Sequence, residues 1–212
     1  MHLPLGELFS FVLVISKRHN IDESHSLGHS MRVFQFAEKI AREEVKYVQN
    51  PEILAEQHSV IQAAAILHDT CDKKYRNEAD GLSEISNLLL PLMSPDKVNA
   101  TLRIIDTMSY SKVKKNGMPD LGGYQTAYNV VREADLLDAY DFDRSMIYHM
   151  QRNNHSIDAA YENAYELFEN RVLRHEADGL LMTHYAKNQH AKLSQKAIRR
   201  MQSWQRVLSV KK

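Results

Sequence analysis

The sequence predicts an all-α fold, and three observations support that prediction. Apolar residues recur every three to four positions along almost the whole chain, which is the period of one helix face. No stretch sustains the alternation of apolar and polar residues that is typical of strands. Only seven glycines and five prolines interrupt the 212 residues. This length suits one core, so we expect a single domain over residues 1–212.

The apolar period places nine helices along the chain. The first contains the apolar run "LFSFVLVIS", and two later ones begin at prolines: Pro51 and Pro95 suit a first turn, where the missing N–H would have no partner anyway. Ser94 can cap the helix that follows it. The expected helices span residues 3–18, 27–48, 52–68, 79–91, 95–108, 124–140, 142–153, 156–176 and 190–209. The last of these is expected to dock on the domain, and binding of a membrane or partner is its alternative role.

One long irregular segment is expected at residues 110–124, "YSKVKKNGMPDLGGY". Its Asn-Gly, Met-Pro-Asp and Gly-Gly steps oppose a continuous helix. Loops of this length inside a domain are often lids or binding loops, and disorder is the alternative. Both interpretations remain open from the sequence.

Charge and cysteine content restrict the class of protein. Lysine plus arginine and aspartate plus glutamate both number 27, so no overall charge favours a nucleic acid or an acidic membrane as partner. The single cysteine, Cys71, excludes an intramolecular disulfide and a thiolate metal cage, and it fits a reducing compartment. The longest early apolar run is too short to span a bilayer. We therefore expect an intracellular, cytoplasmic protein.

Three helical segments each place metal-ligand groups on an apolar face. His29 shares its face with Val33 and Ala37, His68 shares its face with Ile61 and Ala65 and has Asp69 beside it, and Asp135 follows Val131 by four. An unpaired buried carboxylate costs several kcal/mol. A divalent cation would compensate that cost, because imidazole nitrogen and carboxylate oxygen suit Mn, Fe, Co, Ni or Zn. A single buried histidine is more often a hydrogen-bonded core residue, so the coincidence of three segments carries the hypothesis.

An ordered set of motifs resembles the HD-domain superfamily of metal-dependent phosphohydrolases. The set is "HSMRV" at residues 29–33, "AAAILHD" ending at the His68-Asp69 pair, and "READLLDAY" at residues 132–140. The match covers roughly residues 20–140, and residues 155–212 are expected to form a helical C-terminal extension of this HD-type bundle. The resemblance implies one divalent metal ion (Mn, Co, Fe, Ni, Mg or Zn) with four ligands: His29, His68, Asp69 and Asp135.

The stretches "DESHSLGHSMRV" and "EADLLDAYD" resemble small stand-alone members that act on nucleotides. They imply hydrolysis of a small phosphorylated metabolite, above all a nucleotide, by attack of a metal-bound water on phosphorus. Nucleoside triphosphate pyrophosphohydrolase and nucleoside monophosphatase activities both remain open. Two departures are Glu133, where relatives usually have Asp, and Met108, where many have His. No histidine lies between His68 and His149, which favours a mononuclear site over the dinuclear branches.

The resemblance implies a role for Asp72, and charge and spacing suggest roles for other residues. Asp72, three positions after Asp69, is the candidate proton acceptor, and Lys73 beside it is a second catalytic candidate that would contact phosphate. The candidate substrate contacts are Arg32, His25, Lys112, Lys114 and Lys115, and a solvated surface is the alternative for the lysines. His25 could instead support a metal ligand, as could Asp138 if it points inward. We expect Arg132 and Glu133 to form a surface pair. An HD-fold nucleotide-binding or regulatory module without turnover is the alternative function.

Overall fold

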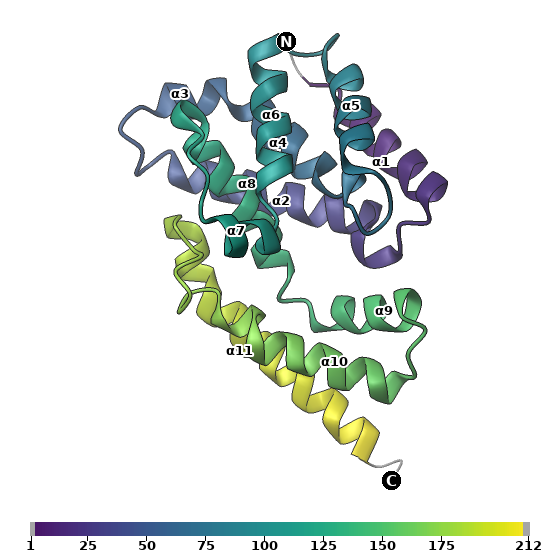
Figure 1. Ribbon diagram of the computed structural model, residues 1–212. Coiled ribbons are helices and arrows are strands. Elements are labelled where there is room, and N and C mark those ends of the chain that lie inside the picture. The colour runs from purple at the N-terminus through teal and green to yellow at the C-terminus, as the bar shows by residue number, and fades with distance from the viewer. Residues whose placement is uncertain (1–2, 210–212) are drawn as a thin grey trace.

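The computed structural model describes residues 3–209, and all regular structure in them is helical (Figure 1), which confirms the predicted all-α class. The α-helices are α1 (Leu5–His19), α2 (Leu27–Glu44), α3 (Pro51–Glu56), α4 (His58–Leu67), α5 (Glu78–Leu89), α6 (Pro95–Thr107), α7 (Tyr110–Asn116), α8 (Gln125–Asp138), α9 (Phe142–Arg152), α10 (Ile157–Asn170) and α11 (His184–Ser209). Four short 3-10 helices join them: η1 (Glu23–His25), η2 (His68–Cys71), η3 (Gly122–Tyr124) and η4 (Val172–Arg174).

Helix α4 lies at the centre of the core. Its sequence, "HSVIQAAAIL", is apolar on nearly every side, and a helix of that kind is stable only when it is surrounded by protein. Helices α2, α6 and α8 pack around it, and α2 also packs along α8. The apolar faces of α2 and α8 meet α4 through residues such as Val33, Ala37 and Val131, all fully buried. This packing brings the start of α2, the end of α4 and the end of α8 together.

Helices α9, α10 and α11 form a second layer below that core (Figure 1). Helix α10 packs on α9, where Phe142 and Phe168 meet edge to face with ring centroids 5.0 Å apart. Helix α11 runs along α2, α8, α9 and α10. The expected C-terminal extension is therefore helical, and it packs on the core rather than standing apart from it.

Two buried carboxylates hold the start of α11 against the core. Glu133 on α8 accepts hydrogen bonds from the backbone N–H of Met182 (2.7 Å) and of Thr183 (2.9 Å) and from the Thr183 hydroxyl (2.6 Å). Glu44 on α2 accepts from the N–H of Tyr185 at 3.1 Å. Such bonds satisfy first-turn donors that no helical carbonyl reaches. The expectation that Arg132 and Glu133 form a surface pair is wrong, because the C-terminal layer covers that face of α8 and buries both.

Three predicted elements differ from the structure. The helix expected at 52–68 is divided at Gln57, whose buried side chain donates a hydrogen bond to the Gly123 carbonyl at 2.7 Å. The last helix begins at His184 rather than at residue 190: Glu44 accepts from an N–H of its first turn, and Glu133 holds the two residues before it. The segment 110–124 is not one irregular loop: Ser109 caps α7, the buried Val113 anchors it, and Gly117 with φ 79° ends it. Within residues 3–209, each helix is too short or too polar to cross a bilayer.

Candidate metal centre and adjoining pocket

His29 is the centre of the polar network that the core encloses. It lies in the first turn of α2, and only 1% of its surface is exposed. Its Nδ1 atom lies 2.7 Å from Oδ2 of Asp138. Because a carboxylate only accepts, Nδ1 carries the proton and donates it. In the neutral imidazole, the lone pair of His29 Nε2 then faces the interior of the site.

His68 presents the same atom from the opposite side. Helix α4 ends there and continues into η2, and His68 Nδ1 lies 3.0 Å from the carbonyl of Ala65, to which it donates. Its Nε2 lone pair then points at Nε2 of His29, only 3.0 Å away. Two lone pairs at this distance repel each other unless a proton or a cation lies between them.

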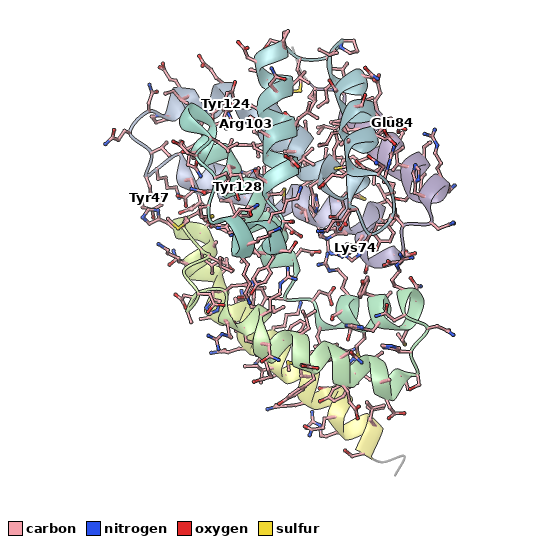
Figure 2. The ribbon with its side chains drawn as sticks, in the orientation of Figure 1. Tyr47, Lys74, Glu84, Arg103, Tyr124 and Tyr128 are labelled. Carbon is pink, nitrogen blue, oxygen red and sulfur yellow. The ribbon has the colours of Figure 1, made fainter. Side chains whose placement is uncertain are left out.

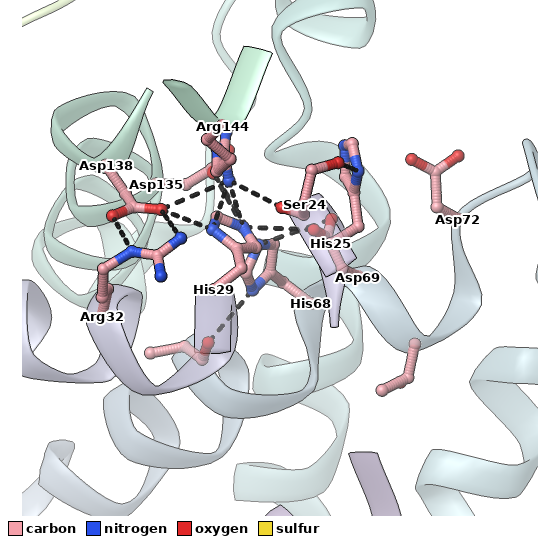
Figure 3. A network of polar contacts seen from close by, with 12 residues as sticks. Ser24, His25, His29, Arg32, His68, Asp69, Asp72, Asp135, Asp138 and Arg144 are labelled. Carbon is pink, nitrogen blue, oxygen red and sulfur yellow. Dashed lines mark hydrogen bonds and ion pairs between the residues drawn. The ribbon is translucent and has the colours of Figure 1, made fainter. Parts of the chain in front are cut away.

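Two carboxylates complete the cluster (Figure 3). Asp69 Oδ2 lies 3.1 Å and Asp135 Oδ1 lies 3.4 Å from His29 Nε2. The same groups approach His68 Nε2 at 3.4 Å and 3.8 Å. Asp69 Oδ2 is buried without a hydrogen-bond partner in the part of the chain that the structure describes. All four predicted ligands thus lie around the contact between the two Nε2 atoms.

The electrostatics of the cluster favour a positive charge at its centre. Burial and the charge of Arg144 lower the pKa of His29, but the neighbouring carboxylates of Asp135, Asp138 and Asp69 outweigh them and raise it to about 10. Burial raises the pKa values of Asp69 and Asp135, and the two histidines more than reverse that effect. Donor atoms of His29, His68 and Asp135 lie within 4.8 Å of one another. Two imidazole nitrogens and one carboxylate in this arrangement fit a divalent transition-metal ion, and Asp69 lies beside them.

Asp138 supports the cluster from behind. Besides His29, it accepts from Nε of Arg32 at 2.8 Å, and Nη1 of Arg144 lies 3.3 Å from its Oδ2. Asp138 is 3% exposed, so of the two orientations that the sequence left open, inward or at the surface, the structure has the inward one. The assignment of Arg32 as a phosphate contact is not supported: Arg32 lies on the far side of Asp138 and lines a groove beside α11 instead.

A cavity of about 640 Å³ adjoins the cluster. The core supplies one side of it through η1, η2 and α7, and the C-terminal layer supplies the other through α9 and the end of α10. Figure 2 shows Lys74 at this boundary between the two layers. The predicted site residues among its walls are His25, His29, His68, Asp69, Asp72, Lys73, Lys112 and Asp135. The four candidate metal ligands and most of the predicted substrate contacts therefore lie around a single cavity.

Asp72 and His25 lie at the edge of the cluster. Asp72 directly follows η2, and its Oδ1 accepts from the N–H of Lys74 at 2.8 Å. Figure 3 shows it apart from the ligand network. His25 Nδ1 lies 2.6 Å from the Ser24 hydroxyl, and its ring centroid is 6.1 Å from that of His29. Both residues face the cavity without belonging to the four convergent ligands.

The loop lysines do not reach the cavity as free charges. Lys112 Nζ is 2.6 Å from Glu78 Oε1 and 2.8 Å from Asp106 Oδ1, so two acidic groups already neutralise it. Lys114 and Lys115 are exposed on α7 outside the cavity walls, and Lys114 lies over the Tyr110 ring. For these two lysines the solvated alternative holds, because α7 is a helix that directs them to solvent.

No motif in the sequence indicated four further residues that line the cavity: Arg144, Tyr148, His149 and Arg171. Arg144 touches a candidate metal ligand: its Nη1 contacts the His29 ring and lies 3.2 Å from Nε2. Only one local signal could have identified it, namely a cation just after the "EADLLDAYD" segment. Arg171 has no such signal, because it reaches the cavity through the packing of α10 on α9.

Comparison with known proteins finds a shared fold but gives no indication of the activity. No model of a known protein family matches the chain, and no curated protein matches it. A crystal structure of a Lactobacillus plantarum protein, determined as a Northeast Structural Genomics target, is similar with a TM-score of 0.71 and 21% sequence identity. The similarity covers 97% of both chains, so it includes the C-terminal layer as well as the core. At this identity it shows a shared fold alone.

Proposed function

We propose that the protein is a divalent-metal-dependent phosphohydrolase of the HD-domain type that acts on a nucleotide. One observation carries the proposal: His29, His68, Asp69 and Asp135, which the motif resemblance implies as ligands, converge with both Nε2 lone pairs directed at one point. A histidine pair 3.0 Å apart and a buried unpaired carboxylate oxygen together favour a cation there.

The adjoining cavity supports a substrate of nucleotide size. Its volume of about 640 Å³ lies within the range of small-molecule sites. Cationic side chains such as Lys73, Arg144 and Arg171 line it beside Tyr110 and Tyr148. Cations suit phosphate groups, and aromatic faces suit a base or a sugar.

The residues of the chain divide the chemistry between them. A divalent ion, when bound, supplies an acidified water and neutralises charge on phosphoryl oxygens. Asp72 lies beside the ligands and is the proposed proton acceptor. Lys73 and Arg144 are placed to hold the reacting phosphate, and Asp138 holds His29 in the tautomer that leaves Nε2 free. Either a monophosphate or a triphosphate is compatible with this division.

Product analysis of the purified protein tests the proposal. The protein is loaded in turn with Mn, Co, Fe, Ni, Mg and Zn and incubated with nucleoside mono-, di- and triphosphates, and phosphate and pyrophosphate are measured separately. We expect one ion per chain and hydrolysis that a double His68→Ala, Asp69→Ala variant loses. His58→Ala is the control, because that histidine pairs with Glu38 at the surface.

Two results would contradict the proposal. Binding of nucleotides without turnover under every metal would support a binding or regulatory module instead. Absence of both nucleotide binding and metal binding would remove the HD-type assignment altogether.

A further inference from the structure

Arg171 reaches the cavity from the C-terminal layer. It stands at the end of α10, where its backbone N–H donates to the Leu167 carbonyl at 3.0 Å and the chain turns into η4. Its guanidinium carbon lies 3.9 Å from the centroid of the Tyr110 ring on α7. A guanidinium stacked on an aromatic face keeps its in-plane N–H groups free for a bidentate contact. Tyr110 and Arg171 thus join the two layers on the wall of the cavity.

The charge of Arg171 has no acidic partner. Over residues 3–209 no carboxylate forms an ion pair with it, and its Nε is buried without a hydrogen-bond partner. Burial lowers its pKa, and the negative charge of Asp135 partly opposes that effect. A partly buried guanidinium without a counter-charge is costly, and a bound anion would offset the cost.

The other long cations of the cavity are already paired or hydrated. Lys112 contacts Glu78 and Asp106, Lys74 lies 3.4 Å from Asp72, and Arg144 contacts Asp138. Lys73 is exposed, so water solvates its charge. Arg171 is therefore the guanidinium on this wall with donor groups to spare.

Arg171 and Arg144 lie at different places in the cavity relative to the proposed metal site, so we expect them to have different roles. Arg144 Nη1 lies 3.2 Å from His29 Nε2, so a phosphoryl group at the cluster meets Arg144 first. Arg171 forms no ion pair with Asp69 or Asp135 in the described residues, although it lines the same cavity as they do. Arg171 lies outside the ion pairs of the cluster, so a ligand that fills the cavity would meet it at a different point from Arg144.

We propose that Arg171, stacked on Tyr110, binds a phosphate of the substrate other than the one that is attacked. The cavity would then be built for a nucleoside di- or triphosphate rather than for a monophosphate. This inference rests on the proposed function, which left the two substrate classes open. It also gives the C-terminal layer a direct part in substrate recognition.

Binding of inorganic anions to the metal-loaded protein tests the inference without turnover. Isothermal titration with pyrophosphate and with phosphate compares wild type, Arg171→Met and Tyr110→Leu. Arg171→Met keeps an unbranched apolar stem but removes the charge, and we expect it to weaken pyrophosphate binding by about tenfold to a hundredfold. Phosphate binding and metal content should change by less than about threefold. In turnover, KM for a triphosphate should rise by the same factor while KM for a monophosphate stays constant.

Matched variants separate the charge effect from a folding effect. Arg174→Met is the control, because Arg174 lies in the same turn but is exposed and pairs with Asp178 at 3.3 Å. Tyr110→Leu removes the stacking face and should follow Arg171→Met. Equal loss of phosphate and pyrophosphate binding, or no loss of either, would overturn the inference. Absence of turnover in a wild type that binds pyrophosphate through Arg171 would overturn the proposed activity instead.

Discussion

Oδ2 of Asp138 lies 2.7 Å from Nδ1 of His29, and this contact determines which nitrogen of the imidazole faces the proposed metal site. Asp138 is itself held by Arg32 and Arg144, so the ring orientation depends on three helices, α2, α8 and α9. A carboxylate behind a metal-bound imidazole fixes its tautomer and raises its basicity. The arrangement makes Asp138 a supporting residue whose loss should be measurable in metal affinity.

We predict that Asp138→Asn lowers the affinity for the metal ion by about 10- to 100-fold. The amide either donates to Nδ1 or accepts from it, so the Nε2 lone pair is no longer assured. Titration of metal-free protein with Mn²⁺ measures the change. Asp143→Asn is the control, because Asp143 pairs with Arg200 and Trp204 away from the ligands. Equal affinities in wild type and Asp138→Asn would contradict the supporting role.

We predict that Asp72→Asn keeps the ion and loses turnover by about 10²- to 10⁴-fold. Asp72 faces the cavity but lies apart from the four ligands, so its amide should leave metal content unchanged. Steady-state kinetics together with metal analysis test this. If the ion is lost, Asp72 is a ligand. If turnover persists, the proton acceptor is another group, and Glu133 is not that group because its carboxylate is fully buried against Thr183.

The grouping of the candidate metal ligands was predictable because each position depends on the period of a single helix. His29 and Asp135 share faces with the buried Val33 and Val131, and the packing of α2 along α8 then brings those faces together. The position of Arg32 was not predictable, because the same period does not say which side of Asp138 it occupies. That choice depends on where α11 and α9 lie, and no local pattern encodes their position.

Glu133 and Arg171 are two further residues whose positions could not be predicted from the sequence. Glu133 follows Arg132, and the sequence suggested a local surface pair. The two do lie 3.8 Å apart, but they are buried, and the Glu133 oxygens accept from the residues before α11, about fifty positions away. Arg171 lies where no motif was found, and it gains a role only because α10 folds back toward α7. Contacts between distant segments decide both cases, and the helical period contains no information on them.

The close approach of α5 to η2 leads to a stability prediction. A Cβ atom on Gly81 would lie 2.4 Å from Cβ of Cys71 and 2.9 Å from its Cα, so Gly81→Ala must displace the segment that carries His68 and Asp69. We expect a loss of about 1–3 kcal/mol in the free energy of unfolding, as in other overpacked cores. Metal affinity should fall with it.

Gly6→Ala is the matched control for that prediction. Gly6 also lies inside a helix, α1, but nothing lies within 4 Å of a Cβ built there. Alanine should stabilise the helix by up to about 1 kcal/mol. Urea denaturation of both variants measures the two changes in the free energy of unfolding, which should have opposite signs. A stabilised Gly81→Ala protein would show that η2 adapts without cost.

We predict that His175 makes the metal-free fold sensitive to acid. The side chain is fully buried, neither ring nitrogen has a hydrogen-bond partner in the described residues, and its ring meets Tyr140 edge to face at 5.5 Å. Burial, followed by the positive charge of Arg171, lowers the pKa of His175 to about 3. The unfolded chain has an ordinary histidine pKa of about 6.5. Between these values the unfolded state binds a proton that the folded state does not, so stability falls as the pH falls below about 6.5.

His175→Phe should remove that contribution while keeping the edge-to-face contact with Tyr140. Urea denaturation of wild type and variant at pH 7.5, 6.5, 5.5 and 4.5 measures it, because the metal-site carboxylates titrate equally in both proteins. The difference in unfolding free energy should be constant above the histidine pKa and should grow in favour of His175→Phe by about 1 kcal/mol per pH unit below it. No partner is lost at pH 7.5, so the variant should be at least as stable there. Parallel pH profiles would mean that His175 is protonated, and therefore hydrated or paired, in the folded protein.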